Sequence, residues 1–266
     1  MNRLTQPGFQ TKDALFVPYM MSGDPTMDAS TDIAVALQEA GADALEWGVP
    51  FSDPLADGPV IQEAGKRAQK NGGNLPQALA GMKEARKKGL HIPAVLFTYV
   101  NPVLTYGVEA LIDDMKESGF DGILIPDLPY EESADWREKF LENGLSLVPL
   151  IAPSSQNRTE KISKSADGFL YYVTSLGVTG ERTSFSEKIA DDIAAIQNFT
   201  EVPVLAGFGI TTNEHVRHFQ SIADGAIVGS AIVKEIGNEE EALLDSRTRA
   251  DAVKRIKSFV EALISY

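Results

Sequence analysis

The chain has 266 residues, 43% of them hydrophobic, a formal net charge of −14 at pH 7 and no cysteine. This length suits one large α/β domain or two small ones, and the apolar content excludes a disordered chain. The negative charge argues against nucleic acid or an anionic membrane as a partner, and the lack of cysteine excludes disulfides, thiolate nucleophiles and cysteine-bound metals. The sequence contains no apolar run of the roughly 18 residues that a membrane span needs, and the N-terminal stretch MNRLTQPGFQ lacks the core of a signal peptide. We therefore expect a cytoplasmic protein.

Short apolar runs alternate with helical patterns along the whole chain. Apolar residues recur at helical spacing between the runs, as in residues 108–115. Eight such strand–helix units predict an α/β fold, a single (β/α)8 or TIM barrel domain that spans residues 1–266. An open doubly wound sheet is the alternative, because a sequence does not show strand order. The eight runs have the continuous apolar character of strands covered on both faces, and they are Leu15 to Met20, Ala44 to Trp47, Ala94 to Tyr99, Gly122 to Ile125, Ser146 to Ile151, Phe169 to Val173, Val202 to Ala206 and Gly225 to Val228.

The interval after the second run is long and carries the main acidic candidates. It fits two helical segments, about Val60 to Asn71 and Leu75 to Lys88, which predicts an extra helical segment after strand 2. Glu46 interrupts an apolar strand, where burial tends to raise the pKa of a carboxyl group toward the neutral range that acid–base catalysis needs. Asp53 and Asp57 follow in a proline-rich loop. The structural alternatives are that Glu46 pairs with a buried base and that the two aspartates make Asx turns.

The residue types near the predicted strand ends exclude several mechanisms. In such a barrel the active site lies at the C-terminal ends of the strands. Lys234 falls in a predicted helix and no other lysine follows a strand, so a Schiff-base mechanism has no nucleophile. His91 precedes its strand, and His215 and His218 fall in a helical stretch, which argues against a histidine-bound metal. We therefore assign the chemistry to carboxylates and hydroxyls and expect no metal site.

Glycine-rich turns follow the last three predicted strands, at residues 177–180, 207–209 and 229–230. Loops after strands seven and eight, with the N-terminus of a short helix, commonly bind phosphate in these barrels through backbone N–H groups. We expect that helix to begin near Ser230 and the substrate to carry a phosphate, although turns also need glycine for their own geometry. Apolar side chains also occur at or near these strand ends, and they are Tyr19, Phe97, Leu124 and Phe208. They could line a pocket for a flat aromatic substrate, and the alternative is that they belong to the ordinary packing of the barrel interior.

At these positions the sequence closely resembles the tryptophan synthase alpha subunit family. The resemblance runs in order from about residue 16 to residue 232, and its most specific segment is PFSDPLADG at residues 50–58. The other matching stretches are 16–19 (FVPY), 23–25 (GDP), 45–46 (LE), 99, 101–102 (NP), 126–129 (PDLP), 177–180 (GVTG), 207–210 (GFGI) and 229–230 (GS).

The resemblance implies a barrel enzyme that cleaves indole-3-glycerol phosphate to indole and glyceraldehyde 3-phosphate by a retro-aldol reaction without a cofactor. It implies that Glu46 is the acid–base group and that Asp57 holds the indole N–H. Tyr171 matches an active-site tyrosine of the family, and Thr179 matches a residue of a loop that closes over the substrate. The family's phosphate site matches Gly180, Gly209, Gly229 and Ser230.

The resemblance also implies a partner. The family's alpha subunit works in an α2β2 heterotetramer and passes indole through a tunnel to a beta subunit that carries pyridoxal phosphate. Asp53, Asn101 and Pro102 match segments that face this partner, so we expect an exposed apolar patch there. Trp47 departs from the smaller aliphatic residue usual in the family, and strand alternation predicts that it packs against helices. Tyr19 adds a hydroxyl where many relatives carry phenylalanine.

Two other functions stay open at this point. The first is a phosphosugar isomerase or a related barrel of aromatic biosynthesis, which would convert its substrate without releasing indole. The second is a subunit that activates a partner and has little activity of its own. Cleavage by the isolated chain at a rate that a beta subunit does not change would count against the second.

Overall fold

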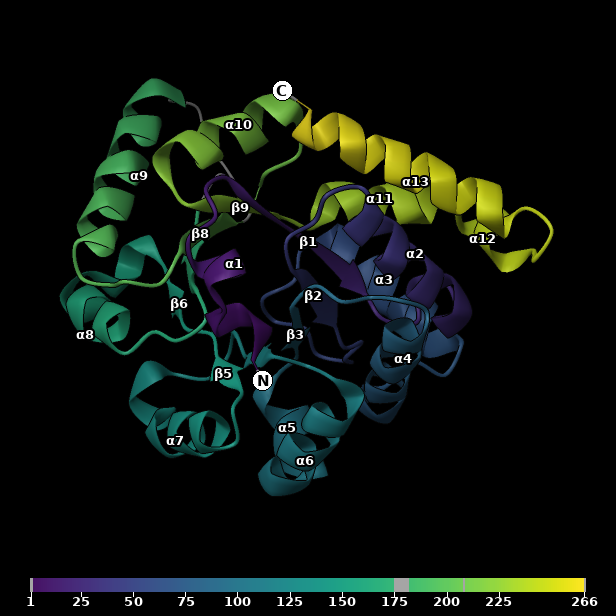
Figure 1. The fold of residues 1–266 in the computed structure, drawn as a ribbon, viewed down its shortest axis with the longest axis horizontal. Helices are drawn as coiled ribbons and strands as arrows, with labels where there is room; N and C mark the ends of the chain where they lie inside the picture. Colours follow the sequence, from purple (N-terminus) through teal and green to yellow (C-terminus); the bar gives the residue numbers. More distant parts are fainter. Residues whose placement is uncertain (1, 175–181, 208, 266) are drawn as a thin grey trace.

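A ring of parallel strands forms the centre of the molecule (Figure 1). The structure is a computed structural model that describes residues 2–174, 182–207 and 209–265, without the side chains of residues 156 and 182–187. The strands follow one another around the ring in the order β5-β4-β3-β2-β1-β9-β8-β7-β6, which confirms the barrel and excludes the reversed order of a doubly wound sheet. The described strands are β1 (Leu15–Met21), β2 (Leu45–Gly48), β3 (Ala94–Phe97), β4 (Gly122–Leu124), β5 (Ser146–Leu147), β6 (Leu150–Ile151), β7 (Leu170–Val173), β8 (Val204–Gly207) and β9 (Gly225–Val228).

The predicted fifth strand, Ser146 to Ile151, is wrong in one respect, because it is divided into β5 and β6. The first half pairs with β4 and the second half pairs with β7. Between them the Val148 N–H donates to the Ile123 carbonyl on one side at 2.9 Å, and the Pro149 carbonyl accepts from the Tyr171 N–H on the other at 3.0 Å. Pro149 has no N–H of its own, so the ladder breaks there. The two halves together occupy one of the eight predicted barrel positions and close the ring.

Helices surround this ring (Figure 1). The long interval after β2 contains α3 and α4, as the sequence predicted, and no helix among the described residues is long and apolar enough to cross a membrane. The helices are α1 (Pro7–Gln10), α2 (Met27–Glu39), α3 (Pro59–Lys70), α4 (Leu75–Lys87), α5 (Val100–Tyr106), α6 (Val108–Ser118), α7 (Ala134–Glu142), α8 (Thr159–Lys164), α9 (Arg182–Gln197), α10 (Asn213–Ile222), α11 (Ser230–Asn238), α12 (Glu240–Leu244) and α13 (Arg249–Ile264), with 3₁₀ turns at Arg3–Thr5, Tyr130–Glu132 and Pro153–Arg158.

Alternation along the strands divides the hydrophobic core into two parts. Val17 and Leu205 belong to a cluster inside the barrel, whereas Phe16 belongs to a larger cluster between the barrel and its helices. Trp47 is fully buried in the outer cluster, and its indole N–H donates to the Ala78 carbonyl of α4 at 3.0 Å. The prediction that Trp47 packs against helices is therefore confirmed.

The N-terminal segment closes one end of the barrel. Leu4 and Phe9 are buried in the inner cluster, and α1 lies over the middle of the ring in Figure 1. Arg3 is held by the buried Asp121, which accepts from the Arg3 N–H at 2.7 Å and from its guanidinium at 3.0 Å. This plug covers the N-terminal ends of the strands, so access to the interior is left to the loops at their C-terminal ends.

Candidate active site

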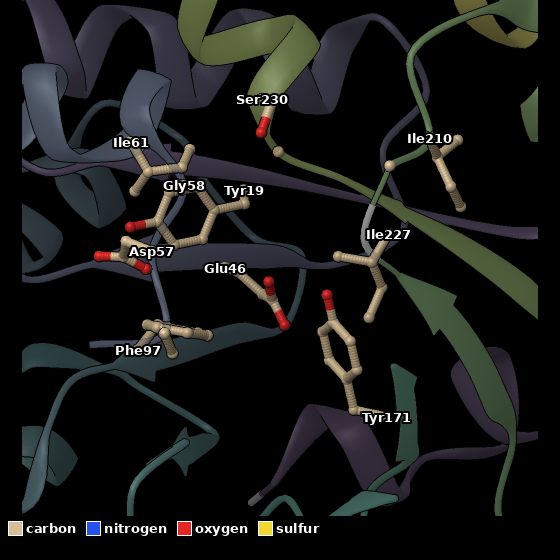
Figure 2. A pocket seen from close by; sticks show the side chains of 13 residues that line it. Tyr19, Glu46, Asp57, Gly58, Ile61, Phe97, Tyr171, Ile210, Ile227 and Ser230 are labelled. Carbon is tan, nitrogen blue, oxygen red and sulfur yellow. The ribbon is translucent and has the colours of Figure 1, made fainter. Parts of the chain in front are cut away.

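A cavity of about 610 Å³, counted with its open mouth, lies at the C-terminal ends of the strands (Figure 2). Asp53, Asn101 and Pro102 are not among its described lining residues, and Thr179, Gly180 and Phe208 lie outside the residues that the structure describes. The cavity brings together eight residues predicted for the site, which are Tyr19, Glu46, Asp57, Phe97, Tyr171, Gly209, Gly229 and Ser230.

Glu46 lies in the middle of this cavity (Figure 2). It is in register with Tyr19 of β1 and Val95 of β3, and alternation turns its side chain into the barrel. The carboxyl group is 1% exposed, and its Oε1 has no hydrogen-bond partner among the described residues. Burial raises the pKa of Glu46 to about 8. A pairing with a buried base is therefore not supported in the described part of the chain, and the carboxyl is mostly protonated at neutral pH.

Asp57 faces the cavity from the loop after β2, in a different environment from Glu46. Its N–H donates to the Pro54 carbonyl at 3.1 Å, and its carbonyl accepts from the Gln62 side chain at 2.8 Å, which fixes the backbone. Burial raises the pKa of Asp57 to about 6, and a hydrogen-bonding contact with the Tyr99 hydroxyl opposes this shift. At neutral pH Asp57 is mostly ionised while Glu46 is mostly protonated, so the two carboxyl groups can act as acceptor and donor.

Two tyrosines of the cavity pack against glycines at the ends of the neighbouring strands. The Tyr19 hydroxyl lies against the Cα of Gly48, and the Tyr171 hydroxyl lies against the Cα of Gly207, so a Cβ at either glycine would overlap a hydroxyl group. Tyr19 also meets Phe97 edge to face, with ring centroids 5.3 Å apart. These close approaches explain why glycine is needed at the two strand ends.

The opposite part of the cavity wall is made of backbone and apolar groups. Gly209, at φ +76°, Gly229 and Ser230 border it, and Ser230 begins the nine-residue helix α11 as the sequence predicted. No side chain among the described residues caps this helix N-terminus, so its first N–H groups are free to meet an anion. The described lining residues include no lysine or arginine, and the described chain contains no group of metal-binding side chains.

Sequence reasoning missed part of the lining. Ala56 and Gly58 flank Asp57, and Ile61 comes from the first turn of α3. Ile227 could have been found from alternation, because it lies between two outward-facing residues of β9. Ile210 follows β8 in the loop that carries Gly209 and gives no comparable periodic signal.

The residues predicted to face a partner lie on the surface of the same end of the barrel. Asp53 and Asn101 are exposed, and Pro102 is half-buried. Two large apolar side chains nearby in the chain are exposed as well, Leu55 at 88% and Leu104 at 60%. Exposed leucines of this kind are typical of interaction surfaces when they gather on one face.

A closed parallel barrel with two carboxyl groups and an uncapped helix N-terminus at its open end defines a class of protein, a (β/α)8-barrel enzyme equipped for acid–base chemistry. The sequence profile of one family, tryptophan synthase alpha chain, matches residues 7–262. The chain belongs to this family, whose members are carbon–carbon lyases, and its reaction is the cleavage of indole-3-glycerol phosphate.

Individual members of the family match this chain in sequence and in structure over nearly its whole length. The tryptophan synthase alpha chain of Halalkalibacterium halodurans is 45% identical over 265 residues and 100% of both chains. That of Geobacillus kaustophilus is 47% identical over 249 residues, which cover 94% of this chain and 93% of the relative. Tryptophan synthase subunit alpha from Legionella pneumophila superposes with a TM-score of 0.85 at 31% identity over 100% of both chains. A chain of the tryptophan synthase a2b2 complex from Pyrococcus furiosus gives 0.82 at 35% identity, over 96% of this chain and 99% of that one.

Proposed function

We propose that the cavity is the active site for this cleavage and that Glu46 is its acid–base group. The observation that carries the proposal is a carboxyl group that is 1% exposed, has one oxygen without a partner among the described residues, and borders a cavity. Burying such a group costs free energy, and burial raises its pKa to about 8. A structural role would favour a partner for the carboxyl, whereas a catalytic role requires it to be free for the substrate.

The chemistry assigns two proton transfers to Glu46. The bond between indole carbon 3 and the glycerol chain breaks when carbon 3 gains a proton and the neighbouring hydroxyl loses one. The protonated carboxyl donates to carbon 3, and the resulting carboxylate accepts the hydroxyl proton, which leaves indole and glyceraldehyde 3-phosphate and restores the acid. A pKa near the working pH suits both directions of transfer.

The other lining residues divide the remaining tasks in this proposal. Asp57, mostly ionised at neutral pH, accepts a hydrogen bond from the indole N–H. Tyr19, Phe97 and Tyr171 provide the aromatic walls. The phosphate lies at the N-terminus of α11, where backbone N–H groups supply the donors. By sequence resemblance the site also includes Phe208 against the indole, Thr179 in a closing loop, and Gly180 with Gly209, Gly229 and Ser230 at the phosphate.

We further propose that residues 1–266 act as one domain that binds a beta subunit through the surface around Asp53, Asn101 and Pro102. The exposed Leu55 and Leu104 support this surface, as does the similarity to the Pyrococcus furiosus a2b2 complex. Pyridoxal phosphate would then belong to the beta subunit. A second hollow shares Ala56 and Phe97 with the cavity, and we propose that indole leaves by this side, away from the phosphate. A phosphorylated substrate is charged and does not cross a bilayer unaided, which supports a cytoplasmic location.

Product analysis tests the proposed reaction. The purified chain, with and without a beta subunit, is incubated with indole-3-glycerol phosphate, and indole and glyceraldehyde 3-phosphate are measured separately. Release of both in equal amounts supports the proposal. An isomerised phosphate ester with no indole would support the isomerase instead, and indole release only with the beta subunit would favour an activating subunit.

The partner surface is tested by leucine substitutions. Leu104→Ser should weaken beta-subunit binding, because an exposed apolar side chain at an interface loses buried area, with a loss of about tenfold or more. Leu141→Ser on α7 is the matched control, since Leu141 is 59% exposed but lies elsewhere in the chain. Equal effects of both substitutions on binding would contradict this surface.

A further inference from the structure

Tyr99 joins the end of β3 to the loop that carries Asp57. It directly precedes α5 and is 1% exposed. Its ring stacks on Phe51, at the start of that loop, with centroids 5.3 Å apart and an angle of 29° between the planes. Phe97 also meets the Tyr99 ring in an edge contact, with ring centroids 6.4 Å apart. The side chain is therefore fixed by packing, and the position of its hydroxyl is well defined.

The Tyr99 hydroxyl contacts two consecutive residues of the loop. Its oxygen accepts a hydrogen bond from the Ala56 N–H at 3.2 Å. Because an N–H group can only donate, the hydroxyl proton stays available for an acceptor. The Asp57 carboxyl, on the residue after Ala56, is close enough to use this proton, and its contact with the hydroxyl lowers the Asp57 pKa against the effect of burial.

The backbone beside Tyr99 is anchored as well. The N–H of Val100, the first residue of α5, donates to the Asp127 carboxylate in the loop after β4 at 2.9 Å. Tyr99 thus connects the loops after β2 and β4 with the start of α5.

We propose that Tyr99 is a positioning residue that holds the Asp57 carboxylate in the place where it meets the substrate. The inference rests on the proposed role of Asp57 and deepens it. The other ionisable groups that face Asp57 or Tyr99 are Tyr19 from β1 and Asp127, and no cation among the described residues replaces the hydroxyl as a partner. The tyrosine hydroxyl is thus the group that orients Asp57 and opposes the effect of burial on its carboxyl.

A double-mutant cycle on Tyr99→Phe and Asp57→Asn tests the proposal. Tyr99→Phe removes one oxygen atom and keeps the packed ring, so the fold is preserved. It should lower kcat/KM for indole-3-glycerol phosphate by about 10- to 100-fold, the effect of a lost hydrogen bond to a charged group. In the Asp57→Asn background, Tyr99→Phe should lower kcat/KM by less than about threefold, because the carboxylate through which Tyr99 acts is already absent.

Tyr106→Phe is the matched control. Tyr106 ends the same helix α5 and donates a hydrogen bond to Asp114, another tyrosine–aspartate pair that lies outside the cavity. Tyr106→Phe removes this hydrogen bond and should leave kcat/KM within about twofold of the parent value. Thermal melting of each variant checks the fold, and a ¹³C NMR titration of the Asp57 carboxyl, which needs no activity, should show a higher pKa in Tyr99→Phe than in the parent.

Three results would overturn the inference. Unchanged kcat/KM and an unchanged Asp57 titration in Tyr99→Phe would show that the hydroxyl positions nothing. An equal loss in the parent and in Asp57→Asn would show a purely structural role for Tyr99. An Asp57→Asn variant with full activity would refute the proposed role of Asp57 itself, and it is distinguished from the first two because it does not involve Tyr99.

Discussion

Glu46 should make the protein less stable, and by an amount that depends on pH. On folding, burial raises the pKa of this carboxyl from 4.5 to about 8. Between these values the folded state keeps a proton that the unfolded state has released, so the stability of the parent falls as pH rises from about 4.5 to about 8. Each pH unit in this window lowers the free energy of unfolding by about 1.4 kcal/mol, so the total decrease at pH 7 is about 3 kcal/mol.

The variant Glu46→Met removes the carboxyl and keeps a side chain of similar length. Its free energy of unfolding should exceed that of the parent by about 3 kcal/mol at pH 7 and by much less at about pH 4, because the carboxyl is then mostly protonated in both states. Urea unfolding at several pH values, with an unchanged m value, measures the difference. Glu142→Met, at an exposed position of α7, is the control and should show no such trend. A stability difference for Glu46→Met that does not vary with pH would refute the reasoning.

Two further substitutions test the packing around the cavity. Gly48→Ala places a Cβ on the Tyr19 hydroxyl and should lower kcat/KM by about tenfold or more, as misplaced active-site groups do, whereas Gly8→Ala, whose Cβ meets nothing, should not change activity. Asp24 is 1% exposed, and its carboxylate accepts two hydrogen bonds from the Arg67 guanidinium, at 2.7 and 2.8 Å. Arg67→Ala removes both bonds and leaves this buried carboxylate without a partner for its charge. Urea unfolding should show that Arg67→Ala lowers the free energy of unfolding by about 3–5 kcal/mol at pH 7. The decrease should become smaller at acidic pH, because the unpaired Asp24 carboxyl then gains a proton. A decrease that does not depend on pH would contradict this explanation.

Much of the fold is readable from the sequence because strand and helix periods differ. Continuous apolar runs predicted the barrel strands, and the helical spacing of the long second interval predicted α3 and α4. The break in the fifth strand was missed, since a run such as residues 146–151 looks continuous and only the pairing shows that it serves both neighbours. Local periodicity reports which face a residue takes, but it does not report which strand lies beside it.

The candidate site divides in a similar way. Glu46 is conspicuous in the sequence because a carboxyl group in an apolar strand is costly. The role of Tyr99 was not predictable, since its contact with Ala56 joins residues 43 positions apart and depends on the conformation of a loop. The function of a tyrosine hydroxyl follows from its partner, which composition and spacing do not reveal.

The most direct test of the central claim is indole release by Glu46→Gln. The variant keeps the size of the side chain and removes the exchangeable acid proton. Release of indole from indole-3-glycerol phosphate should fall by at least about 100-fold, the usual contribution of a general acid–base group. Binding of indole-3-propyl phosphate, which has the same skeleton without the chain hydroxyls, should stay within about threefold of the parent. Indole release at the parental rate, with binding intact, would contradict the assignment of Glu46 as the acid–base group.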